Sequence, residues 1–396
     1  MPSDLKPGVA PSSKPKFWND PDKRALLFQV LMVLTVVGFI GYLVNNALTN
    51  LEQRGITTGF AFLGQTSGFD ILLSLVEYDS THTFGTTFVV GLLNTLLVSA
   101  LGIILATLIG FVMGVARLSN NWLIGKVAAA YIEIFRNIPL LLQIFFWYFA
   151  VLRALPAPRQ SIEFGSAFLN VRGLYLPSPV FESGFGLVTI AIGIAIAAVI
   201  VLTRWNKKRQ DATGQRFPVL WTSLAILFGL PLLAFLVAGM PMSLDYPALQ
   251  GFNFRGGMTI IPELLALLFA LSIYTGAFIA EIVRSGIEAV NKGQTEAASA
   301  LGLPKGKTLR LVVIPQAMRV IIPPLTSQYL NLAKNSSLAT AIGYPDLVSV
   351  FMGTTLNQTG QAIEIIFMTM AVYLLISLSV STLMNWYNKR MALVER

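Results

Sequence analysis

The sequence has no cysteine, a single histidine and few charged residues, which make up only 12% of its 396 residues. Without cysteine the chain can form no disulfide, thiol nucleophile or cysteine-ligated metal centre. One imidazole cannot build a multi-histidine site, so we predict no metal site and interpret His82 as a loop residue outside the membrane. Because soluble globular proteins carry about 25% charged residues, the low charge content excludes an ordinary soluble domain of this length.

Long apolar runs dominate the chain, since 55% of the residues are hydrophobic and the mean hydropathy is +0.68. A helix crosses about 30 Å of hydrocarbon with about 20 apolar residues. We therefore predict an all-α, polytopic membrane protein with about eight transmembrane helices. The candidate spans lie at roughly 25–48, 86–115, 127–152, 184–203, 217–239, 259–283, 320–343 and 364–386. The third and the seventh are the weakest, because each contains charge and proline.

The basic residues are distributed unevenly between alternate loops. If the N-terminus is placed inside, 21 of the 28 Lys and Arg residues lie in inner segments and five lie in outer loops. This asymmetry follows the positive-inside rule, so it predicts that both termini are cytoplasmic. We interpret the excess of basic residues, which gives a net charge of +9, as a contact with membrane lipid, and we predict no binding of nucleic acid.

The longest predicted inner loop, residues 284–319, contains a short segment with helix signals. Residues 296–301 have high helix propensity, and Gln294 or Thr295 could begin the helix. Gly302 supplies a C-terminal stop, with a proline just beyond it. We expect a helix-turn-helix at the cytoplasmic surface, where a short helix between two spans could act as a lever for a cytoplasmic partner.

The stretch 302–308 has the composition of a phosphate-binding loop but not its spacing. That loop needs four residues between its first glycine and its Gly-Lys pair, and it follows a strand. Here three residues intervene and the stretch follows a helix. We therefore predict that this chain binds no ATP and has no cofactor of its own.

Around the short helix the sequence closely resembles the ABC-importer permease family. The family signature is Glu-Ala-Ala, a glycine a few residues on and a later Ile-Pro or Leu-Pro, and in that family the helix is the coupling helix that docks on an ATPase subunit. Segments 131–140 and 334–338 look like its polar amino-acid branch, which carries His, Glu, Gln or Arg. The coupling residues that this resemblance implies are Gly293, Gln294, Glu296, Ala297, Ala298, Gly302 and Pro315.

The resemblance divides the chain into a five-span core and additional segments. The core comprises residues 86–152 and 259–386, the second part holding the coupling loop. Outside it lie an extra first span with its outer loop at 25–85, an insertion with two spans at 153–258, and cytoplasmic tails at 1–24 and 387–396. This enlarged layout looks like the long permeases of general L-amino-acid importers in Gram-negative bacteria.

The same resemblance implies an assembly in the bacterial inner membrane. Its expected partners are a second homologous permease, forming a heterodimer, two ATPase subunits that hold ATP and Mg, and a periplasmic amino-acid-binding protein. The chain itself is then a transport subunit and not an enzyme, and it moves L-amino acids by alternating access.

Charged residues within the third and seventh spans leave structural and functional roles open. Glu133 and Arg136 lie three residues apart on one helical face, as an ion pair between helices or as part of a substrate site or gate. Pro139 interrupts the helix just beyond and frees backbone groups, which are tolerated at membrane depth where they line a cavity. Lys334 either lines the pathway, or snorkels or pairs with Glu281.

An α-amino acid is a zwitterion, so its pathway needs polar groups that offset the cost of burying two charges. Residues 137 and 143 do not share a face if the helix continues through the proline, whereas 331 and 334 do. The candidates for the substrate pathway are Asn137, Gln143, Asn331, Lys334 and Ser336.

Two other functions compete with an ATP-driven permease. An ion-driven secondary transporter often has paired broken helices, and the sequence shows no such pair. A membrane scaffold that transports nothing would leave the polar residues of the third and seventh spans without a purpose.

Overall fold

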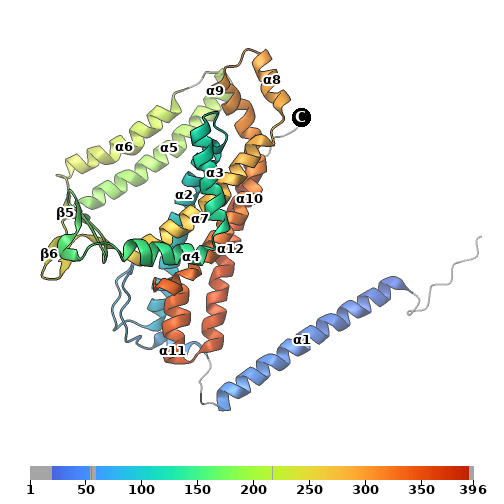
Figure 1. The fold of residues 1–396 in the computed structure, drawn as a ribbon, viewed down its shortest axis with the longest axis vertical. Helices are drawn as coiled ribbons and strands as arrows, with labels where there is room; N and C mark the ends of the chain where they lie inside the picture. The colour runs from blue at the N-terminus through green and yellow to red at the C-terminus, as the bar shows by residue number, and fades with distance from the viewer. Residues whose placement is uncertain (1–19, 54, 56–58, 216, 392–396) are drawn as a thin grey trace, which may run out of the picture.

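The structure is a computed structural model that describes residues 20–53, 55, 59–215 and 217–391 (Figure 1). Long helices dominate it, which confirms the prediction of an all-α, polytopic membrane protein. Within the described residues, seven helices are long and apolar enough to cross a membrane: α1 (Pro21–Gln53), α2 (Phe84–Arg117), α5 (Phe185–Thr213), α6 (Val219–Val237), α7 (Pro262–Glu288), α10 (Ile314–Asn335) together with the helical turns that extend it to Lys305–Ile342, and α12 (Ala362–Met391).

Shorter helical segments complete the helical part of the fold. They are η2 (Phe60–Gly64), α3 (Trp122–Asn137), α4 (Leu140–Phe145), η3 (Phe146–Leu152), η4 (Pro158–Gln160), α8 (Lys292–Ala300), α9 (Lys305–Thr308), η5 (Leu309–Val313), η6 (Ser336–Ile342), η7 (Val348–Thr355) and α11 (Leu356–Thr359). The third predicted span is α3 followed by α4 and η3, bent by 106° between the two halves. Eight spans are present if this bent pair counts as one, and the break falls at Pro139, where the sequence predicted that the helix is interrupted.

Helix α7 lies at the centre of the core and packs against α2, α3, α4 and α10. Its contact with α2 is a close approach of two backbones. A Cβ added at Gly110 would lie 2.5 Å from the Cβ of Ile279, and one added at Gly114 would lie 2.6 Å from the carbonyl oxygen of Ala280. Small residues spaced four apart thus let α2 and α7 come together, as they do at other membrane helix interfaces.

Replacing Gly110 with leucine is expected to disrupt this α2–α7 contact, because the new side chain would collide with Ile279 and with the carbonyl oxygen of Gly276. Overpacking of this kind costs about 1–3 kcal/mol or more. The readouts are the yield of monodisperse protein and its thermal midpoint in detergent. Gly193→Leu on α5 is the matched control, because an added Cβ there meets nothing within 4 Å. Equal stability of the two variants would contradict this packing.

The segments flanking the α5–α6 hairpin form eight short strands, which the sequence did not predict. They are β1 (Ile162–Phe164), β2 (Ala167–Asn170), β3 (Gly173–Leu176), β4 (Ser178–Phe181), β5 (Met242–Asp245), β6 (Ala248–Gln250), β7 (Asn253–Arg255) and β8 (Met258–Ile260). A four-stranded antiparallel sheet has the order β1-β2-β3-β8, and β4–β5 and β6–β7 form two ribbons. We call β1 to β8 the strand module; Tyr175 of β3 pairs with Thr259 of β8, directly before α7 begins.

The strand module and α8 lie at opposite ends of α7. Strand β8 leads into the first turn of α7, and α8 follows its last turn. A helix of 27 residues is about 40 Å long. The module and the predicted coupling helix therefore lie about one bilayer thickness apart.

The first span and the insertion lie at the periphery of the molecule. Helix α1 is exposed along its length and lies apart from the other helices (Figure 1). Helices α5 and α6 pack on each other and expose many large apolar side chains. Helix α5 continues to Thr213, ten residues beyond the end that the sequence predicted for the fourth span at 203, so the basic residues that follow 203 are helical.

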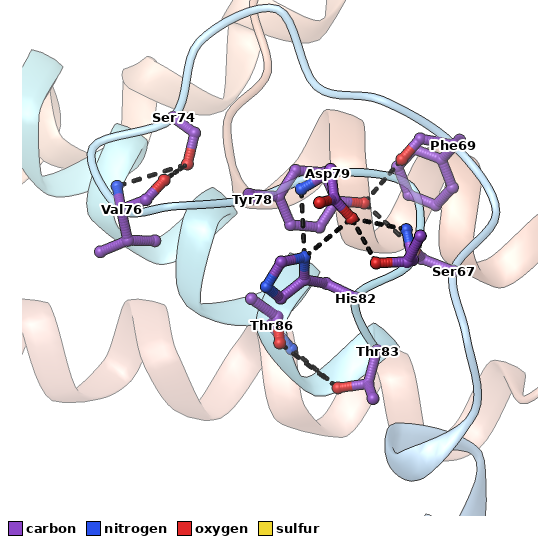
Figure 2. A network of polar contacts seen from close by, with 10 residues as sticks. Ser67, Phe69, Ser74, Val76, Tyr78, Asp79, His82, Thr83 and Thr86 are labelled. Atoms are coloured by element: carbon purple, nitrogen blue, oxygen red, sulfur yellow. Dashed lines mark hydrogen bonds and ion pairs between the residues drawn. The ribbon is translucent and has the colours of Figure 1, made fainter.

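His82 lies in the loop before α2, inside a network of polar contacts that Figure 2 shows. The hydroxyl of Thr81 and, less strongly, its backbone N–H and His82 stabilise the Asp79 carboxylate, lowering its pKa to about 2. Nearby, the Tyr78 hydroxyl donates to the carbonyl oxygen of Phe69 over 2.7 Å. The interpretation of His82 as a loop residue is confirmed, and its contacts are those of a loop that is folded on itself.

Candidate functional site

Helix α8 is the short helix predicted in the inner loop. It begins at Lys292, because the side chain of Asn291 accepts a hydrogen bond from the backbone N–H of Gly293 over 2.8 Å. The expected start at Gln294 or Thr295 is therefore wrong by a few residues. Asparagine is among the preferred N-cap residues, so the correct start was present in the sequence as a local signal.

Gly302 ends α8 in the conformation that the sequence predicted. Its φ is +74°, in the left-handed region that glycine adopts without strain. Its N–H donates to the carbonyl oxygen of Ser299, and the N–H of Leu303 donates to that of Ala298. These bonds satisfy carbonyl groups that the helix end would otherwise leave free.

The predicted coupling residues form an exposed surface on a braced helix. Glu296 and Ala297 are exposed, whereas Ala298 is buried against the rest of the loop. Leu301 at the tip is 82% exposed, which is unusual for so large an apolar side chain. The side-chain amide of Gln316, next to Pro315 in the first turn of α10, lies 3.3 Å from that of Gln294. Helix α8 is therefore tied to α10 while its outer face remains free.

The third span bends at Pro139 for a local reason. Proline has no N–H and disfavours helical geometry in the preceding residue. Ile138 accordingly has extended backbone, with φ −96° and ψ 126°. The bend leaves carbonyl groups at the end of α3 without helical partners.

Gln143 and Asn137 satisfy carbonyl groups near this bend. The side-chain amide of Gln143 donates to the carbonyl oxygens of Phe135 and Ile138, each over 3.0 Å. That of Asn137 donates to the carbonyl oxygen of Glu133 over 2.7 Å. Gln143 is buried and braces the bend, while its assignment to the substrate pathway stays a prediction. Asn137 is exposed but its amide is used in the same way.

Replacing Gln143 with methionine is expected to destabilise the bent span, because it leaves two carbonyl oxygens without a donor. Each unsatisfied buried group costs about 1–3 kcal/mol. The thermal midpoint should fall by several degrees in detergent. Leu142→Met, at the exposed neighbouring residue, is the control. A midpoint equal to that of this control would rule out the bracing role.

The charged residues within the spans do not form the ion pairs that the sequence suggested for Glu133 with Arg136 and for Lys334 with Glu281. Arg284 bonds to Glu281 over 2.6 Å and also to Glu288, so Glu281 does not pair with Lys334. Among the described residues Arg136 forms no ion pair with Glu133. Its guanidinium lies 5.2 Å from the ring centre of Phe278 on α7, which is cation–π geometry. Arg136 thus links α3 to α7, as does the hydroxyl of Tyr131, which donates to the carbonyl oxygen of Ile273 over 2.7 Å.

Among the predicted pathway residues, Lys334 lines a cavity of the structure. The cavity has a volume of about 340 Å³ and lies between the end of α10, η7 and α12. Lys334 is exposed and its amine has no hydrogen bond or ion pair to another described residue. Asn331, one turn earlier, is also exposed. Ser336 is buried and donates to the carbonyl oxygen of Ala333, and its assignment to the pathway stays a prediction.

The cavity also contains polar residues that were not among the candidates predicted from the sequence. Thr369 and Tyr373 of α12 and Ser337 lie beside Lys334 in its lining. Thr369 and Tyr373 are four residues apart in an apolar span, and this helical spacing is the signal that could have found them. We call Lys334 and these three residues the Lys334 cluster.

A second group of missed residues holds the loop after η6 against α2. The hydroxyl of Tyr344 donates to the carbonyl oxygen of Asn94, and the side chain of Asn94 donates to that of Pro345. Asp346 is fully buried and accepts the N–H of Ser349 over 2.8 Å, so it caps η7. These contacts hold the loop between η6 and η7 against α2, and η7 in turn lines the Lys334 cavity.

The comparisons with known proteins agree with the motifs. The family described as "Binding-protein-dependent transport system inner membrane component" matches residues 190–393. The chain is 60% identical over 378 residues to the "Putative amino-acid ABC transporter permease protein YhdX" of Escherichia coli (strain K12), covering 95% of this chain and 96% of that protein. It is 53% identical over 378 residues to the "General L-amino acid transport system permease protein AapQ" of Rhizobium johnstonii, covering 95% and 94%.

A more distant relative is the "Glutamate/glutamine/aspartate/asparagine transport system permease protein BztB" of Rhodobacter capsulatus, 43% identical over 405 residues and covering 94% of this chain and 95% of that protein. Among solved structures, that of an amino acid ABC transporter with histidines has 21% identity and a TM-score of 0.45, covering 78% of this chain and 95% of that one. The predicted resemblance to ABC-importer permeases is confirmed by the sequence matches along nearly the whole chain. This chain therefore belongs to the family of binding-protein-dependent transport system inner membrane components, as a membrane permease of the ABC-transporter kind.

Proposed function

We propose that this chain is the permease subunit of an importer that moves L-amino acids across the bacterial inner membrane, driven by separate ATPase subunits. The observation that carries the proposal is α8, a capped helix with a free outer face between two core spans, in a chain whose near relatives are named amino-acid permeases. A protein surface of this kind suits a partner that pushes on the helix. Within the described residues the chain offers no cluster that could hold a metal ion.

The packing around α7 supports mechanical coupling between α8 and the cavity beside Lys334. Helix α8 follows α7 directly and is tied to α10 through Gln294 and Gln316. Helix α7 contacts α2, α3 and α4, and Lys334 lies in the last turn of α10. A displacement of α8 would therefore move α7 and α10 together, and through them the other core helices that they contact. For ATP to drive transport in this way, ATP and substrate must favour different states of the assembly.

The complete transporter is proposed to contain two ATPase subunits, a periplasmic amino-acid-binding protein and a second homologous permease. ATP and Mg are held by the ATPase subunits, since stretch 302–308 lacks the spacing of a phosphate loop. Lys334 is exposed at the mouth of its cavity in the single chain, which suits a pathway completed by a second permease. The division into a core at 86–152 and 259–386 with an insertion at 153–258 is part of this proposal.

The test is to purify the chain from its native membrane and identify what accompanies it. We expect a stoichiometric ATPase, and in proteoliposomes we expect amino-acid uptake that requires internal ATP and the binding protein. Uptake driven by an ion gradient without an ATPase would favour a secondary transporter. The one bent helix pair among the described residues gives that alternative little support, because secondary transporters often have paired broken helices.

Cysteine labelling tests the proposed topology, with both termini in the cytoplasm. The native chain has no cysteine, so a single introduced thiol reports one position. In intact cells an impermeant reagent should modify Glu77→Cys in the loop before α2 and should leave Thr213→Cys, at the end of α5, unmodified until the cells are opened. Both residues are exposed, whereas Ser67 in the same outer loop is buried and unsuitable. The reverse pattern would overturn the orientation.

A further inference from the structure

A cavity of about 460 Å³ lies where the strand module meets the first turn of α7. We call it the module cavity. Its lining comes from four separate parts of the chain: the loop before α2, the end of the third span, the two flanks of the insertion, and the start of α7. Its volume is within the range of about 300–1,000 Å³ that is usual for small-molecule sites. It lies at the opposite end of α7 from α8, and hence on the outer side in the proposed topology.

Two cations and one anion face this cavity without pairing directly. Arg153 donates to the hydroxyl of Tyr148 over 2.9 Å, and that hydroxyl donates to Glu263 over 2.8 Å. Tyr148 thus separates Arg153 from Glu263 and orients both head groups. The network uses one carboxylate oxygen of Glu263 and one guanidinium nitrogen of Arg153, which leaves donors and an acceptor for a ligand.

Arg172 is the second cation and is not part of this network. Its guanidinium donates to the carbonyl oxygen of Phe252 over 3.2 Å and forms no ion pair with another described residue. On the neighbouring wall the hydroxyl of Tyr175 donates to the side-chain oxygen of Asn253 over 3.1 Å. This bond turns the amide NH₂ of Asn253 away from Tyr175, so that it remains a donor.

We propose that the module cavity is a second amino-acid site, which binds an α-amino acid with a side-chain carboxylate on the outer side of the membrane. The inference rests on the proposed function and adds a role for the insertion. Glu263 receives the ammonium group, and Arg153 and Arg172 receive the two carboxylates, for which the planar guanidinium offers paired donors. With two cations against one anion, the cavity has an excess of one positive charge, which an acidic amino acid cancels and a basic one increases.

The site would concentrate acidic substrates near the core before they enter the pathway. A carboxylate side chain of a protein that docks on the outer surface could meet the same two arginines. The free amino acid is favoured, because its ammonium group would use the second carboxylate oxygen of Glu263, which a protein carboxylate alone would leave unused.

Thiol protection in the purified transport complex tests the proposal. Thr259→Cys places a thiol in the cavity lining on β8, and Ser183→Cys places one on an exposed residue outside it. We expect millimolar L-glutamate to slow modification of Thr259→Cys several-fold, L-lysine to leave it unchanged, and neither to affect Ser183→Cys. Adding Arg172→Gln should abolish the protection. If Thr259→Cys does not fold, Leu72→Cys reports on the same cavity from the loop before α2.

Three results would overturn the inference: no protection by glutamate, equal protection by lysine, or protection that survives Arg172→Gln. Protection that requires the binding protein and not glutamate would instead make the cavity a docking surface. Uptake of labelled amino acids by the same preparation separates this inference from the proposed function. Normal ATP-dependent uptake without protection removes only the second site, whereas absence of any amino-acid uptake removes the proposed function.

Discussion

Replacing Gly302 with valine is expected to lower amino-acid uptake and substrate-stimulated ATPase activity about tenfold, while the protein remains folded in the membrane. Gly302 has a φ of +74°, and an added Cβ would meet nothing within 4 Å, so the effect comes from backbone strain and not from a collision. Left-handed backbone costs an L-residue about 1–2 kcal/mol. That cost would be relieved by displacing the end of α8, the part of the loop proposed to meet the ATPase. The measurements are uptake in proteoliposomes and ATP hydrolysis with and without substrate and binding protein.

Gly306→Val is the matched control for this experiment. Gly306 lies four residues further along the same loop, in α9, and an added Cβ there also meets nothing within 4 Å. Its φ is not in the left-handed region, so valine can be accommodated with only the loss of helix propensity. Normal coupling in Gly302→Val, or equal losses in both variants, would remove the assignment of α8 as the coupling helix.

The coupling loop was predictable because its signals are local. A glycine followed by a proline ends a helix, and this information lies within a few residues of the helix that it ends. Asn291 was an equally local signal for the start, and the prediction missed it by giving weight only to the apolar and alanine-rich part. The apolar spans were predictable for the same reason, since each needs only its own length and composition to be recognised.

The roles of the site residues were less predictable, because they depend on partners that are distant in sequence or on local changes in helix geometry. The bracing contact of Gln143 could not be predicted, because only the bend at Pro139 brings the carbonyl of Phe135 within reach of its amide. Ser336 follows Lys334 closely, but the chain changes from α10 to the tighter η6 there and carries its hydroxyl inward. The strand module depends on pairing between segments on either side of the α5–α6 hairpin, as between Tyr175 and Thr259, and no local pattern encodes that register.

Replacing Lys334 with methionine is expected to reduce kcat/KM for amino-acid uptake by roughly 10- to 100-fold, because a hydrogen bond to a charged group contributes about 1.5–3 kcal/mol. Methionine retains an unbranched apolar stem and removes only the ammonium group. Lys334 lines a cavity beside Ser337, Thr369 and Tyr373 and has no charged partner among the described residues, so its charge is available for a substrate carboxylate.

Lys389→Met, at an exposed lysine in the last turn of α12, is the control for the loss of one positive charge. We expect that both variants purify with the same subunits and that only Lys334→Met changes uptake. Dissociation of the complex in Lys334→Met would instead assign this lysine a structural role at the contact between subunits. Unchanged uptake kinetics would show that the amine neither meets the substrate nor supports the site, and the pathway would then have to lie on another face of the core. The design separates these outcomes because subunit composition and uptake are measured on the same preparation.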